Sequence, residues 1–65
     1  MDKARLEYEM KKQGITTAKL CEQLGMAPST FYRKCAGKSE FTLSEIKKIG
    51  ETLRLESLTP IFFAG

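Results

Sequence analysis

The stretch Ile15–Gly37, with the sequence ITTAKLCEQLGMAPSTFYRKCAG, constrains the fold of this chain more than any other. Gly25 lies in its middle, where glycine allows the left-handed backbone that turns a chain sharply after a helix. Pro28 suits the first turn of a helix, because its missing N–H has no helical partner there and its φ is already helical. The stretch therefore predicts two short helices, over 17–24 and 28–36, joined by an abrupt turn.

Helical periodicity continues on both sides of this stretch. Asp2 is a good N-cap for a first helix that runs to about Gln13, and Gly14 provides its stop. Near the other end, Pro60 can open a last short turn over 60–64. No stretch of the chain alternates with the period of a β-strand.

A capping box, Thr42-Leu43-Ser44-Glu45, opens one more helix that runs to about Leu53. Its apolar residues recur with the spacing of a helix face turned to a core. The chain is therefore predicted to be all-α, a compact bundle of four to five helices. The side chains expected inside it are Leu6, Met10, Leu20, Cys21, Leu24, Met26, Phe31, Cys35, Leu43, Ile46, Ile49, Gly50, Leu53 and Leu55.

Size and composition exclude several classes of protein. Sixty-five residues form one domain, 1–65, which is too small to enclose the cavity that most enzymes need. The chain has no histidine, and two cysteines, Cys21 and Cys35, are too few for a zinc site. We therefore expect no enzyme, metal, cofactor or small-molecule ligand. The net charge of +3 is compatible with a nucleic-acid partner without requiring one.

The sequence also gives an expectation for location. It has neither a basic leader followed by an apolar run nor a stretch approaching the about 20 apolar residues of a membrane span. A reducing, cytoplasmic location is expected, with no membrane partner. Both thiols should then be free and act as small apolar core residues.

The pattern around the central turn resembles the family of phage Cro and cI repressors and related bacterial regulators. The resemblance spans Leu6–Leu55, and the strings TFYRK and EFTLSEIKKI are similar to small Cro-like proteins of phages of Gram-positive hosts. It implies a lambda-repressor-like fold with a DNA-binding helix-turn-helix over 16–37. The residues that carry it are Leu20, Cys21, Leu24, Gly25, Met26, Phe31 and Gly37.

The chain departs from that family at several positions. Thr17 stands where the family often has a phosphate-gripping glutamine, and Ala27 stands where the reading helix usually has a serine or threonine cap. Many members pair a buried arginine with a glutamate, and Met10 and Cys35 occupy those two positions. Replacing both ions by apolar groups is tolerated better than losing one. We therefore predict that Met10 and Cys35 touch.

The resemblance implies that the helix over 28–36 enters the major groove of DNA. Pro28, Ser29 and Arg33 are the candidate base contacts, because they share its outward face. Arg33 can donate two hydrogen bonds to one guanine, the commonest specific contact. The candidate DNA-backbone contacts are Thr16, Thr17, Thr30, Tyr32, Lys34, Lys38 and Ser39.

The C-terminal segment 56–65 is unusually apolar for a short tail. An exposed apolar patch usually marks an interface, so a homodimer contact is expected there. The alternative is a monomer in which these side chains fold back over the core. The residues concerned are Leu58, Ile61, Phe62 and Phe63.

These observations favour a sequence-specific transcriptional regulator, a Cro-like phage or prophage repressor that binds double-stranded operator DNA. A protein-interaction module, either an antirepressor or an anti-activator with the same fold, is the alternative. The Arg33→Ala substitution distinguishes the two, because it should abolish sequence preference in the first and leave partner binding intact in the second.

Overall fold

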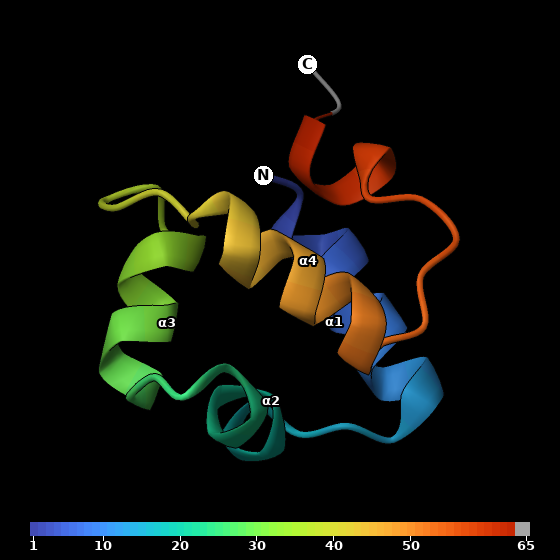
Figure 1. Ribbon diagram of the computed structural model, residues 1–65, viewed down its shortest axis with the longest axis horizontal. Coiled ribbons are helices and arrows are strands. Elements are labelled where there is room, and N and C mark those ends of the chain that lie inside the picture. Colours follow the sequence, from blue (N-terminus) through green and yellow to red (C-terminus); the bar gives the residue numbers. More distant parts are fainter. Residues whose placement is uncertain (64–65) are drawn as a thin grey trace.

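The computed structural model describes residues 1–63, and this part of the chain is helical without strands. The predicted all-α fold is therefore confirmed. Figure 1 shows α3 at one edge of the molecule and the C-terminal turn beside the start of the chain. The elements are α1 (Lys3–Gln13), α2 (Thr17–Leu24), α3 (Pro28–Cys35), α4 (Leu43–Thr52) and a π-helical turn, η1 (Thr59–Phe63). The predicted last turn extends to residue 64, which lies outside the described residues.

The helix ends follow the local chemistry expected of them. The Asp2 carboxylate accepts from the Arg5 N–H at 3.0 Å. The capping box of α4 is complete, since Glu45 accepts from the Thr42 N–H at 2.8 Å and Thr42 accepts from the Glu45 N–H at 3.2 Å. Gly25 has φ +67° after α2, so the turn between α2 and α3 uses the left-handed backbone that glycine adopts without strain.

The core forms where α2 packs against α3 and α4. Met10 is buried in this core and Cys35 is half-buried against it. Neither lies in solvent, as the apolar replacement of an ion pair requires, and their direct contact stays a prediction. The buried cluster is Leu6, Met10, Leu20, Cys21, Phe31, Ile49, Leu53 and Ile61.

The prediction that Leu43 points inward is wrong, because its side chain is 66% exposed. Leu43 is the first residue of α4, and the buried face of that helix begins one turn later, at Ile46. Phe41 instead fills the edge of the core. Its ring lies edge-on to Phe31 at 5.8 Å and to Phe62 at 5.7 Å between centroids. Phe41, just before the helix, thus packs against the core while Leu43 does not.

The C-terminal segment folds back over the body of the protein. Ile61 is 2% exposed, and its carbonyl accepts from the Asp2 N–H at 2.7 Å, which joins η1 to the start of α1. Phe62 packs against the core, and Leu58 lies over Gly50 so closely that a Cβ there would be 2.8 Å from Leu58 Cδ2. Only Phe63 of the four predicted dimer residues is well exposed, at 57%. Leu58, Ile61 and Phe62 therefore pack on their own chain, and a homodimer contact in this segment stays a prediction.

Within residues 1–63, none of the helices has the length and apolar character that crossing a bilayer would require.

Candidate nucleic-acid interface

One aromatic side chain anchors α3 and leaves its opposite face free. Phe31 is 3% exposed and lies edge-on to Tyr32 at 6.1 Å between centroids. Successive turns of a helix place residues four apart on one face, so Ser29 and Arg33 project together away from this anchor. The predicted base-contact residues Pro28, Ser29 and Arg33 are all exposed, as is Thr30.

The first turn of α3 has open hydrogen-bond donors. Ala27 provides no side-chain cap, and its carbonyl accepts the first helical bond, from the Phe31 N–H at 3.1 Å. The N–H groups of Ser29 and Thr30 therefore have no helical acceptor. Donors at an exposed helix N-terminus suit a negatively charged group such as a phosphate. The weak cap noted in the sequence thus leaves this end of α3 free to bind.

The first turn of α2 has a side-chain cap. The Thr16 hydroxyl accepts from the Lys19 N–H at 3.1 Å, so its own hydrogen remains available to donate. Thr16 is exposed and Thr17 is half-buried. Together with the unpaired N–H groups of the first turn, they form a second set of donors at a helix start.

The loop after α3 holds another part of the predicted backbone contacts. Lys38 is exposed, and its N–H donates to the Arg33 carbonyl at 3.0 Å, which ties the loop to the end of α3. Tyr32 is exposed, whereas Ser39 is half-buried. Lys38 and Tyr32 thus have side chains free to reach a ligand.

Lys34, one of the residues predicted to contact the DNA backbone, is paired within the protein. Its Nζ donates to Glu45 Oε1 at 2.6 Å, and the two side chains are only 12% and 21% exposed. The same amine lies 5.8 Å from the centroid of the Phe41 ring. The Lys34 amine points to α4, where the Glu45 carboxylate lies within hydrogen-bond reach. The sequence contained one signal of this internal pairing, because Lys34 falls on the inward side of a short helix.

The sequence profile of the Cro/C1-type HTH DNA-binding domain matches residues 5–56. The chain belongs to this family. No curated protein and no solved structure matches the chain. The family match begins within α1, covers α2 to α4 and ends before η1. The exposed face of α3 is therefore the candidate DNA-binding surface of this Cro/C1-type domain.

Glu45 joins two elements of this Cro/C1-type domain. Partial burial raises the pKa of its carboxyl, but the hydrogen bond from Lys34, the Thr42 N–H and the charge of Lys34 outweigh that effect. The net pKa is lowered from the ordinary value of 4.5. A charged carboxylate is thus the favoured form in the folded protein.

The two thiols of the Cro/C1-type domain lie in the core region. Burial raises the pKa of Cys21 and is also the main cause of the raised pKa of Cys35. A raised pKa disfavours the reactive thiolate. Both cysteines therefore fit the predicted role of small apolar residues.

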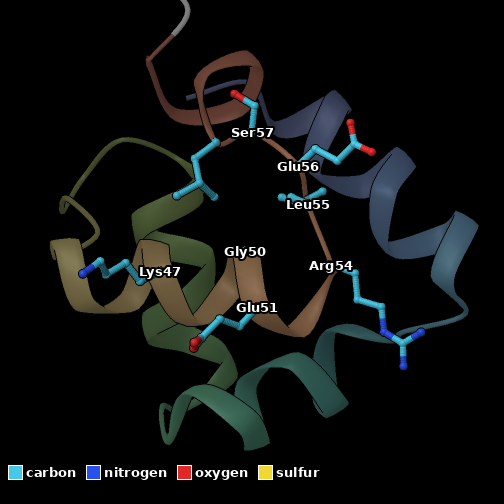
Figure 2. A pocket seen from close by; sticks show the side chains of 8 residues that line it. Lys47, Gly50, Glu51, Arg54, Leu55, Glu56 and Ser57 are labelled. Atoms are coloured by element: carbon cyan, nitrogen blue, oxygen red, sulfur yellow. The ribbon is translucent and has the colours of Figure 1, made fainter.

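A shallow hollow lies between α4 and the segment 54–58, and no residue of α3 lines it (Figure 2). The charged ends of Lys47, Glu51 and Arg54 point apart around it instead of converging on one point. Groups that do not converge cannot act together on a bound molecule. Within residues 1–63, no three potential metal ligands gather either.

Proposed function

We propose that this chain is a transcriptional repressor of the Cro-like type, of phage or prophage origin, which binds operator DNA in the bacterial cytoplasm. The single observation that carries the proposal is the exposed face of α3 in a Cro/C1-type domain. Ser29 and Arg33 extend from that face, one turn apart. Binding alone blocks transcription, so the proposed mechanism needs neither catalysis nor a cofactor.

In this proposal α3 lies in the major groove with its first turn deepest. Arg33 donates two hydrogen bonds to a guanine, Ser29 bonds a base, and Pro28 gives apolar contact to a thymine methyl. Thr16 and Thr17 bind one phosphate through the first turn of α2, and Thr30, Tyr32, Lys38 and Ser39 bind others. Lys34 is left out of this set because Glu45 holds its amine.

Titration against DNA tests the proposal. A duplex selected from a random pool and an unselected duplex are titrated with the full chain at two salt concentrations. Wild type should prefer the selected duplex and bind more weakly as salt rises. Arg33→Ala should weaken binding to the selected duplex by about tenfold or more and abolish the preference over the unselected one.

Arg54→Ala is the matched control, because Arg54 is also an exposed arginine but lies beyond the end of α4. It should leave the preference unchanged. Absence of any DNA binding at low salt would overturn the proposal and favour the protein-interaction module.

Homodimerisation on DNA is part of the same proposal. Two reading helices would then lie about 34 Å apart on a near-palindromic operator. The surface available for it is narrower than the sequence suggested, because Ile61 is buried within the monomer. Phe63 and Met1, both exposed, border one groove and are the residues we propose for the contact.

A further inference from the structure

The Lys34–Glu45 pair is the one side-chain hydrogen bond between charged groups of different helices in the part of the chain that the structure describes. Its donor lies on α3 immediately after Arg33, and its acceptor lies in the first turn of α4. At 2.6 Å it is short, as expected of a charge-assisted hydrogen bond. The ion pairs within α1 and α2 are longer, from 3.8 to 4.0 Å.

Glu45 is itself held rigidly. Its carboxylate also accepts from the Thr42 N–H at 2.8 Å, so it cannot follow Lys34 without breaking the capping box. The next residue, Ile46, is buried. A fixed point on α4 therefore holds a side chain of α3.

The remaining support of α3 is mostly non-directional. The helix has eight residues, no side-chain cap at Ala27, and apolar contacts through Phe31 and Cys35. Helices this short depend on tertiary contacts for their stability. Apolar contacts resist separation of the helix from the core but allow rotation more readily than a hydrogen bond of defined geometry does.

We propose that Lys34 is a positioning residue for DNA reading: its bond to Glu45 sets the orientation of α3 on α4 and thereby directs Ser29 and Arg33 at the bases. Lys34 gives no phosphate contact in this arrangement. The role in DNA reading rests on the proposed function. The constraint that the Lys34–Glu45 bond places on α3 exists in the free protein as well.

Neutralising Glu45 distinguishes its effect on the orientation of α3 from the effect of its charge on DNA affinity. Glu45→Gln keeps an oxygen that can cap α4 but removes the charge that holds Lys34. Loss of a negative charge alone should strengthen DNA binding. We expect the opposite, a loss of about tenfold in affinity for the selected duplex, because an ill-oriented α3 loses about one good base contact.

Glu40→Gln is the matched control. Glu40 is exposed in the loop between α3 and α4 and forms no ion pair within residues 1–63. It should leave affinity unchanged or raise it slightly. The inference is overturned if Glu45→Gln raises affinity as Glu40→Gln does.

A second pair of variants tests the absence of a phosphate contact. Lys38→Met should lower the slope of log affinity against log salt by about 1, the effect of losing one phosphate contact. Lys34→Met should lower the preference for the selected duplex and leave that slope unchanged. A slope lowered equally by both variants would make Lys34 a phosphate contact and overturn the inference.

Amide hydrogen exchange of the free protein measures, without DNA, how strongly the Lys34–Glu45 bond constrains α3. In Glu45→Gln the amides of α3 should exchange several-fold faster relative to those of α2, which the pair does not hold. Unchanged protection of α3 would overturn the inference even if wild type binds DNA. If Glu45→Gln shows this loss of protection but wild type binds no DNA, the proposed function alone is overturned.

Discussion

Arg54 occupies a backbone conformation that glycine usually takes at the end of a helix. Its φ is +53°, and within residues 1–63 it is the one residue other than glycine with a positive φ. It ends α4 in the same way that Gly14 ends α1, since the Leu55 N–H returns to the Gly50 carbonyl at 2.9 Å. The sequence located the end of α4 near Leu53, but an arginine gives no sign of a left-handed residue.

Replacing this arginine should stabilise the protein. Arg54→Gly removes left-handed strain, part of which is offset by the greater freedom of glycine in the unfolded chain, so the free energy of unfolding should rise by about 0.5–1 kcal/mol. Urea denaturation measures the change. Arg54→Ala removes the same charge but keeps the strain, and it should give no increase. An equal gain in both variants would assign the effect to charge.

At the scale of elements, helix starts were predictable and helix contacts were not. The caps at Asp2, Thr16 and Thr42 are local, because each joins residues three apart in the sequence. The bond between Lys34 and Glu45 joins residues 11 apart on two helices, and it depends on how α3 and α4 cross. The sequence identified Glu45 as part of a capping box and Lys34 as a contact to the DNA backbone, but it did not pair them.

The same pair predicts a pH dependence of stability. Because folding lowers the pKa of Glu45, the pair stabilises the folded state above the ordinary pKa of 4.5, and this contribution is lost as pH falls through the lowered value. The free energy of unfolding should therefore decrease in acid more for wild type than for Glu45→Gln. Denaturation at pH 7 and at successive values below 4.5 measures the difference. Parallel curves for the two proteins would contradict it.

At the scale of the whole molecule, the C-terminal segment closes the core. Ile61 is buried against the first four helices, and the Asp2–Ile61 hydrogen bond joins the two ends of the described chain. Figure 1 shows η1 lying over the start of α1. An apolar tail read from sequence alone fits a dimer contact equally well, because burial inside a monomer and burial between monomers remove the same surface from water.

Truncating the buried and the exposed side chain should separate these two roles. Ile61→Ala should lower the free energy of unfolding by about 2–4 kcal/mol, and Ile61→Val by about 1 kcal/mol if the first variant does not fold. Phe63→Ala should change it by less than about 0.5 kcal/mol, because Phe63 is exposed. Denaturation at several protein concentrations completes the test. A wild-type midpoint that rises with concentration, and no longer does so in Ile61→Val, would place Ile61 in an interface.

The sequence by itself determined the helices, their caps, the turn at Gly25 and the family resemblance, because each depends on residues close together along the chain. It also identified the outward face of α3, since helical periodicity places Ser29 and Arg33 opposite Phe31. Only the tertiary structure decided that Phe41 covers the core in place of Leu43, that Lys34 binds Glu45 and that Ile61 is internal. Each of these depends on which surfaces meet when the helices pack, and competing partners for an apolar or charged side chain differ only in that geometry.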